Sequence, residues 1–192
     1  MSESESTCTA FAGDRLLARG APGTVAVAVK RAAAAHDATI LVYDDRTGRV
    51  LDFDLRGSDA EVAERAGGPA ADPAAPGRPR GRPRLGVVAR EVTLLPRHWD
   101  WLAQQPEGAS AALRRLVDAA RHAGAEADRI RQAQTAADRF MMAMLGDRDG
   151  WEEASRALYA RDGARFHALS EGWPADLRDH ARRLAAPAFP TP

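Results

Sequence analysis

The chain has 192 residues, 45% of them hydrophobic and 28% charged, and its formal net charge is zero. Such a composition supports a buried core and excludes a chain that is disordered throughout. The single cysteine, Cys8, excludes an internal disulfide and a zinc cage built from cysteines.

The N-terminus carries none of the features of a secretion signal. Glu3 and Glu5 make it acidic, and no apolar core of a signal peptide follows. Nowhere does an apolar stretch approach the roughly 20 residues that a membrane span needs. We therefore expect a cytoplasmic protein with no membrane partner, built as one large domain or two small ones.

The first 65 residues predict a small α+β unit. "TAFAGDRLLARG" (9–20) has two short apolar runs around Gly13 and Asp14, which indicates a hairpin or a bent strand. "TVAVAVKRAAAAHD" (24–37) begins with strand-like alternation but continues as an alanine run, and it predicts a helix with Thr24 as its N-cap.

The clearest element is a β-hairpin in "TILVYDDRTGRVLDFDLRG" (39–57). The apolar run 40–43 predicts a buried strand, Asp44 to Gly48 has turn chemistry, and residues 50–55 alternate apolar and acidic side chains. Ser58 and Glu61 then form the pattern of a capping box, which predicts that a short helix begins there.

Residues 66–85 contain five prolines and four glycines and predict a linker, because such a segment propagates neither a helix nor an interior strand. After it, 87–95 predicts a strand and Pro96 the first turn of a helix. "PEG" (106–108) ends that helix, and Ser110 is the expected N-cap of the next one. Apolar stripes with helical spacing occupy the rest of the chain.

The predicted fold class is therefore α+β: a small N-terminal strand-helix-hairpin unit, a Pro/Arg linker, then a strand followed by a mainly helical C-terminal region. The strand before Pro96 either pairs with a second copy or joins the N-terminal sheet. The predicted boundaries are a disordered N-terminus (1–8), an α+β domain (9–65), the linker (66–85), a strand-helix-helix segment (86–123), a helical region (124–186) and a tail (187–192).

Positive charge is concentrated in the middle of the chain. Residues 76–122 hold nine basic and four acidic side chains, a net charge of +5, whereas 1–75 have a net charge of −4 and 123–192 of −1. A polyanion such as duplex DNA would therefore meet the chain in its middle third.

Residues 91–120, "EVTLLPRHWDWLAQQPEGASAALRRLVDAA", resemble a ribbon-helix-helix segment in layout. The resemblance implies a homodimer whose paired strands enter the major groove of DNA. In the register of that family Arg90, Val92 and Leu94 would face the groove, and only Arg90 is a typical DNA-reading residue. The opposite register exposes Thr93 and Glu91. The alternative is that Val92 and Leu94 pack inside the protein.

The linker sequence "RGRP" (80–83) is similar to an AT-hook, whose arginines lie in a narrow minor groove. The alternative is a linker with solvated charges, since 26 of the 27 basic residues are arginine and such a tetrapeptide arises easily. The predicted DNA contacts are Arg78, Arg80, Gly81, Arg82, Pro83 and Arg84 in the linker, Arg90 and Thr93 in the ribbon, and Arg114 and Arg115 in the following helix.

Patterns that would carry catalysis are weaker, and we predict no catalytic, cofactor-binding or metal-binding residue. Asp176 and His180 share a helix face at i and i+4, which is the usual spacing of a surface pair. An enzyme using His98, His167 or Asp176 remains a third hypothesis, beside a DNA-binding protein and a partner-binding adaptor that does not bind nucleic acid.

Several stretches together resemble a bacterial family known as domain of unknown function 2239. They are "TAFAGDRLLARG", "ILVYDDRTGRVLDFDLRG", "GRPRLGVVAREVTLLPRHWDWLAQQPEGASAALRRLVDAARH", "FMMAMLGD" and "EGWPADLRDHARRLA". The resemblance spans nearly the whole chain. It implies that the segments belong to one type of protein, and it brings no activity, cofactor or catalytic residue with it.

Overall fold

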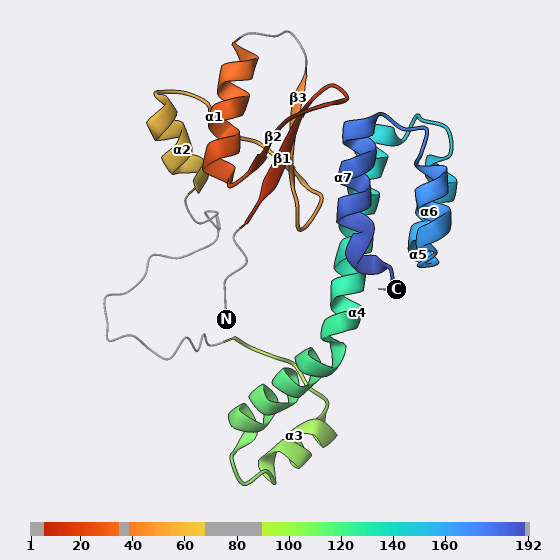
Figure 1. The fold of residues 1–192 in the computed structure, drawn as a ribbon. Helices are drawn as coiled ribbons and strands as arrows, with labels where there is room; N and C mark the ends of the chain where they lie inside the picture. Colours follow the sequence, from red (N-terminus) through yellow and green to blue (C-terminus); the bar gives the residue numbers. More distant parts are fainter. Residues whose placement is uncertain (1–5, 35–38, 68–89, 191–192) are drawn as a thin grey trace. The chain divides into compact units, whose positions relative to one another are not determined.

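Figure 1 shows the fold as a computed structural model, which describes residues 6–34, 39–67 and 90–190. The chain divides into two compact units. We call residues 1–69 and 127–192 the larger unit, and residues 70–126 the smaller unit. The fold is α+β, as predicted, with a four-stranded antiparallel sheet near the N-terminus and helices over most of the remainder.

The sheet is formed by two hairpins: the first is one of the two forms that the sequence left open, and the second is the predicted β-hairpin. Strands β1 (Cys8–Ala12) and β2 (Arg15–Gly20) form the first, and β3 (Ile40–Asp44) and β4 (Val50–Leu51) form the second, in the order β2-β1-β3-β4. Strand β4 is shorter than predicted. After Leu51 the chain leaves the sheet, although Phe53 and Leu55 still pack against its apolar side chains.

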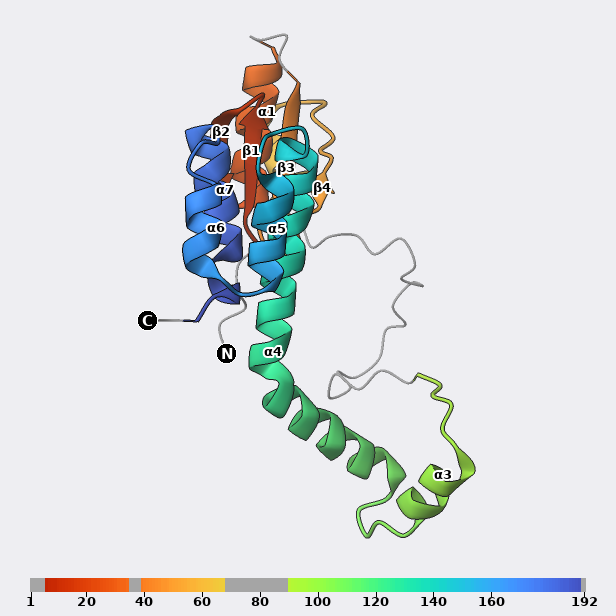
Figure 2. The same ribbon diagram turned by 90° about the vertical axis from the view of Figure 1, so that its right-hand side faces the viewer.

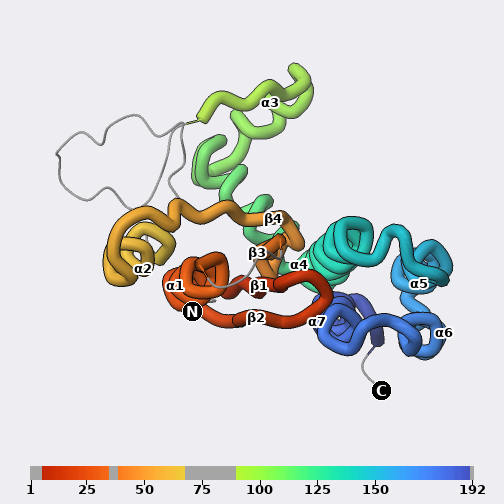
Figure 3. Tube along the Cα trace, turned by 90° about the horizontal axis from the view of Figure 1, so that it is seen from above, coloured from red at the N-terminus to blue at the C-terminus, as the bar shows by residue number. Residues whose placement is uncertain are grey.

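One face of the sheet is covered by α1 (Pro22–Ala33). This helix begins two residues before the predicted N-cap, because the fixed φ of Pro22 already suits a first helical turn. Val25 and Val29 pack with Cys8, Ala10 and Val42 of the sheet. Figure 3 shows α1 between the sheet and α2 (Asp59–Gly67).

The predicted capping box at the start of α2 is confirmed. The backbone N–H of Ser58 donates to Glu61 Oε2 at 2.7 Å, and the backbone N–H of Glu61 donates back to Ser58 Oγ at 3.3 Å. Asp59 also forms ion pairs with Lys30 at 3.0 Å and Arg31 at 2.8 Å, both on α1. These contacts fasten α2 to α1.

The opposite face of the sheet is covered by C-terminal helices, and this contact forms the main core. Phe11 and Tyr43 come from the sheet, Phe140 from α4 (Ala109–Leu145) and His180 from α7 (Ala175–Ala185). The ring centroids of Tyr43 and Phe140 lie 5.1 Å apart, and those of Phe140 and His180 4.4 Å apart, both in edge-to-face geometry. Figures 1 and 2 show α7 alongside the sheet.

Helices α5 (Trp151–Tyr159) and α6 (Gly163–Leu169) pack on the side of α4 and α7 away from the sheet (Figure 3). The residues assigned above to a tail also contribute to the core. Ala188, in the short 3-10 helix η1 (Ala186–Ala188), is fully buried, and the ring of Phe189 lies 5.4 Å from that of Phe166. They are buried because Phe166 and its neighbours leave an apolar surface beyond the end of α7.

In the smaller unit the structure describes residues 90–126. The helix predicted at Pro96 is α3 (Pro96–Ala103), and the next helix is α4, which begins at Ala109 directly after Gly108, so that Ser110 is not its N-cap. The predicted strand is not present at residues 90–95, and these residues do not join the four-stranded sheet. A strand needs a hydrogen-bonded neighbour, and the single chain supplies none there. Residues 87–89 lie outside the described part.

The turn between β3 and β4 lies directly against α4. Asp44 Oδ1 accepts from the backbone N–H of Thr47 at 2.7 Å, and the carbonyl of Asp44 accepts from Gly48 N at 2.8 Å. Gly48 has a φ of +65°, and a Cβ placed on it would lie 2.2 Å from the carbonyl oxygen of Ala136. Only glycine fits both requirements, so this residue sets how closely the turn approaches the helix.

We expect Gly48→Ala to destabilise the protein by about 2–5 kcal/mol, because a left-handed φ and an overpacked contact each contribute about 1–3 kcal/mol. Gly13→Ala is the matched control. Gly13 also has a positive φ, +57°, but its added Cβ would meet no heavy atom within 4 Å. Urea unfolding measures both changes, and equal losses in the two variants would contradict the close approach at Gly48.

Candidate functional site

The structure describes part of the predicted DNA-binding surface. Arg78, Arg80, Gly81, Arg82, Pro83 and Arg84 all lie outside the described residues, so the hook remains a sequence-based prediction. The other predicted contacts, Arg90, Thr93, Arg114 and Arg115, belong to the smaller unit and are exposed.

Arg90 and Thr93 lie in the segment 90–95 that precedes α3. Among the described residues, the only backbone hydrogen bonds of this segment are those that Leu95 O accepts from His98 at 2.8 Å and from Trp99 at 3.3 Å, which start the helix. The backbone groups of residues 90–94 thus make no backbone hydrogen bond with any residue that the structure describes.

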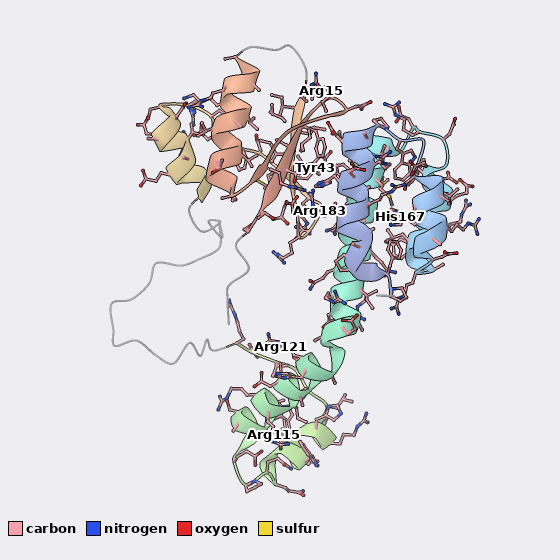
Figure 4. All side chains as sticks on the ribbon, in the orientation of Figure 1. Arg15, Tyr43, Arg115, Arg121, His167 and Arg183 are labelled. Carbon is pink, nitrogen blue, oxygen red and sulfur yellow. The ribbon has the colours of Figure 1, made fainter. Side chains whose placement is uncertain are left out.

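The two arginines near the start of α4 differ in how they are paired. Arg114 Nη1 donates to Ser110 Oγ at 3.0 Å, a neutral partner on the same helix. Arg115 forms an ion pair with Glu107 at 2.9 Å (Figure 4 labels Arg115). Hydrogen bonds from its own backbone and from Arg115 lower the pKa of Glu107, so that this carboxylate stays charged. Arg114 therefore presents its full charge, while that of Arg115 is offset.

Few apolar side chains of the smaller unit are buried. Within residues 90–126 only Leu102 and Ala112 are buried hydrophobic residues. These two side chains make up the buried apolar core of the unit in the residues that the structure describes. The large apolar side chains it exposes are Val92, Leu95, Trp99, Trp101, Leu116 and Val117, each between 42% and 54% exposed.

The candidate catalytic residues do not form a site. Asp176 Oδ2 accepts from the backbone N–H of Leu16 at 2.7 Å, whereas His180 is buried among aromatic rings, so the two residues do not act as a pair. The exposed His98 and His167 line neither of the two cavities beside α4 described below. The part of the chain that the structure describes has no cluster of metal ligands.

Cys8 offers no nucleophile to such a site. Burial, followed by the charges of Asp45 and Asp44, raises the pKa of its thiol to about 11. The thiolate is the reactive form of cysteine, and at neutral pH this side chain remains a thiol. The residue acts as part of the sheet's apolar core.

A second concentration of positive charge, which the sequence does not predict, lies in the larger unit. Two open cavities, of about 230 Å³ and 270 Å³, lie between the β3–β4 turn and α4, and Arg46 and Gln132 line both. We call them together the arginine groove. The charged residues that line it are Arg46, Arg129, Arg131, Arg139 and Arg183, with Asp45 and Asp128.

The β3–β4 turn and one face of α4 build the smaller cavity. Arg139 Nη1 donates to the backbone carbonyl of Thr47 at 3.0 Å and so fastens the turn to the helix. Asp128, Arg131 and Thr135 line the same cavity at intervals of three or four residues, the spacing that puts side chains on one helix face.

Arg183 is held in the larger cavity by residues of strand β1, of the β3–β4 turn and of its own helix. Its Nη2 donates to Thr9 Oγ1 at 3.1 Å and lies 3.5 Å from Asp45 Oδ1, while Thr9 Oγ1 donates to Asp45 at 2.7 Å. Nη2 also contacts His180 Nδ1. Figure 4 shows Tyr43 and Arg183 between the sheet and α7. The guanidinium is thus fixed in place by three partners.

His180 is neutral at physiological pH. Burial lowers the pKa of its imidazole to about 4, the nearby Asp45 raises it and Arg19 lowers it further. Because Nδ1 faces a guanidinium donor, it accepts, and the ring proton lies on Nε2. Because the imidazole of His180 is uncharged, it adds no second positive charge beside the guanidinium of Arg183.

The sequence gives no signal for this groove. Its five arginines come from positions between 46 and 183, and 26 of the 27 basic residues in the chain are arginine. The sequence spacing of Arg46 and Arg183 does not distinguish them from the other arginines of the chain. Only the contact of the β3–β4 turn with α4 and α7 brings them together.

The larger unit is an α+β assembly in which helices from both ends of the chain enclose one antiparallel sheet. A protein-family model described as "Uncharacterized protein conserved in bacteria (DUF2239)" matches residues 7–185. The chain belongs to this family. Neither a curated protein nor a solved structure matches it. Of the helices in the described residues, none combines the length and the apolar character required to cross a membrane.

We expect the free energy of unfolding to fall by about 3 kcal/mol, beyond the effect of the carboxylates, as the pH drops from about 6.5 to about 4. In this window the unfolded chain protonates His180, whose ordinary pKa is 6.5, and the folded chain, with a pKa of about 4, does not. Above about pH 6.5 His180 is neutral in both states, so its full contribution to the free energy of unfolding is present there. Urea unfolding at a series of pH values measures it.

His180→Phe keeps an aromatic ring against Phe11 and Phe140 and removes the titration. The difference in unfolding free energy between wild type and this variant isolates the histidine, because the carboxylates titrate in both. A pH dependence as steep in the variant as in the wild type would contradict the neutral, buried His180.

Proposed function

We propose that the protein is a cytoplasmic homodimer that binds duplex DNA weakly and acts as a transcriptional regulator. The observation that carries this proposal is the segment 90–95. It lies directly before α3, leaves the backbone groups of its first five residues unpaired among the described residues, and exposes Arg90 and Thr93. A second copy of the same segment would satisfy those groups as an antiparallel ribbon.

The apolar surface of the smaller unit supports self-association. Val92 and Leu95 are 51% and 48% exposed. Among the described residues of this unit, Leu102 and Ala112 are the buried apolar side chains. Pairing two such units would bury Val92 and Leu95 and build a shared core, which is how small units stabilise themselves when one chain is too short.

The charge of the middle third supports a polyanion as the partner. Residues 76–122 carry a net charge of +5, and the linker holds four arginines within seven residues, 78–84. Four phosphate contacts correspond to a slope of about −3.6 in the logarithm of affinity against the logarithm of salt concentration. Contacts of this number give weak, sequence-independent binding.

The alternative function is a partner-binding adaptor that does not bind nucleic acid. The exposed Trp99 and Trp101 on α3 favour it, because tryptophan is enriched in protein–protein interfaces. A gel-shift titration at low salt separates the two functions, since the adaptor gives no shift with duplex DNA.

We expect replacement of the four linker arginines, Arg78, Arg80, Arg82 and Arg84, by alanine to weaken binding to random-sequence duplex DNA and to flatten its salt dependence. If all four contact phosphates, the slope decreases by about 3.6. Fluorescence anisotropy at several salt concentrations measures both quantities.

The charge-matched control replaces four exposed arginines of the larger unit, Arg15, Arg148, Arg156 and Arg165, by alanine. It changes the net charge by the same amount and leaves the linker intact. If both variants lose affinity equally, general charge accounts for the binding and the linker has no special role.

We also expect Val117→Lys to shift the protein from dimer to monomer. Val117 is 54% exposed in the single chain, so the substitution leaves the folded monomer nearly unperturbed but places a charge in an apolar interface. Sedimentation equilibrium gives the mass, and Met142→Lys, at a 69% exposed position of the larger unit, is the control. A wild-type protein that remains monomeric at high concentration would rule out the dimer.

A further inference from the structure

We propose that the arginine groove of the larger unit binds a small molecule that carries two or more phosphate groups, of the class of nucleoside diphosphates. This site is separate from the proposed DNA surface, because every residue that lines it belongs to the larger unit.

The charge of the groove defines an anion as its ligand. Five arginines and two aspartates line the two cavities, which leaves a surplus of three positive charges. Asp128 is paired with Arg131 and Asp45 with Arg183, so neither carboxylate is directed at the open space without a cation beside it. Arg46, which lines both cavities, has no ion pair or side-chain hydrogen bond with any residue that the structure describes.

Two of the guanidinium groups are held in position by the protein itself. The carbonyl of Thr47 holds Arg139, and Thr9, Asp45 and His180 hold Arg183. Groups that are ordered before a ligand arrives lose less conformational entropy on binding. A planar guanidinium donates two parallel hydrogen bonds to the oxygens of a phosphate. This geometry favours a phosphate ligand over an anion that acts only as a point charge.

The size and lining of the groove favour a small molecule over a nucleic acid. Its two cavities measure about 230 and 270 Å³, slightly below the roughly 300–1,000 Å³ of a typical ligand pocket, and Arg46 lines both. The larger cavity has an apolar wall of Ala133, Ala136 and Leu184 beside Arg183. Phosphates would bind the arginines around Arg46, and an uncharged part of the molecule would lie against that wall.

The test measures binding of ADP and of pyrophosphate to the full chain by isothermal titration calorimetry. We expect both to bind, ADP more tightly because of the apolar wall. Arg46→Ala should weaken both at least tenfold, and Arg46→Lys, which keeps the charge but not the paired donors, should weaken them less. The control is Arg156→Ala, at an exposed arginine of α5 paired with Glu152 and Glu153.

The result that overturns the proposal is an absence of binding by the wild type, or equal binding by the Arg46→Ala and Arg156→Ala variants. Citrate that binds as tightly as pyrophosphate would overturn the assignment to phosphate. Arg46 is exposed and makes no side-chain hydrogen bond in the described residues, so the variant is expected to fold, and its melting temperature checks this.

A further arm separates this site from DNA binding. The variant with four linker alanines should bind ADP as the wild type does, and Arg46→Ala should bind duplex DNA as the wild type does. If Arg46→Ala lowers DNA affinity and no ADP binding is found, the groove belongs to a nucleic-acid surface and the small-molecule proposal is wrong.

Discussion

The packing of Phe11 and Tyr43 against Phe140 is the contact on which the larger unit depends. An antiparallel sheet whose two faces are both apolar must be covered on both sides. Residues near the N-terminus supply one cover, α1, and the chain has to return more than 90 residues later to supply the other. The two ends of the sequence therefore share one core.

Because the C-terminal helices pack on the N-terminal sheet, polar side chains from distant parts of the sequence also meet in this unit. With α4 pressed against the sheet, the β3–β4 turn meets the helix at Gly48, and Arg139 fastens it there. With α7 on the same face, Arg183 reaches Thr9 and Asp45. A groove lined by arginines results beside the edge of this hydrophobic core.

The two basic regions of the molecule differ in physical character. Two arginines of the groove, Arg139 and Arg183, are held by backbone and side-chain partners beside two cavities, which suits a small ligand. In the smaller unit, Arg90 and Arg114 lie on an exposed surface beside unburied apolar side chains, which suits a large partner and a second subunit.

The sequence by itself determined the local elements whose residues carry their own signals. Gly48 marked the turn, Ser58 with Glu61 marked the start of α2, and the short apolar runs in β1 and β3 predicted strands, because backbone preferences act over a few residues. The linker hook remains a prediction from composition alone. The tertiary structure alone decided that the C-terminal helices cover the N-terminal sheet, that His180 is buried and neutral, and that Arg46 and Arg183 line one groove, because these depend on contacts between residues more than 90 positions apart.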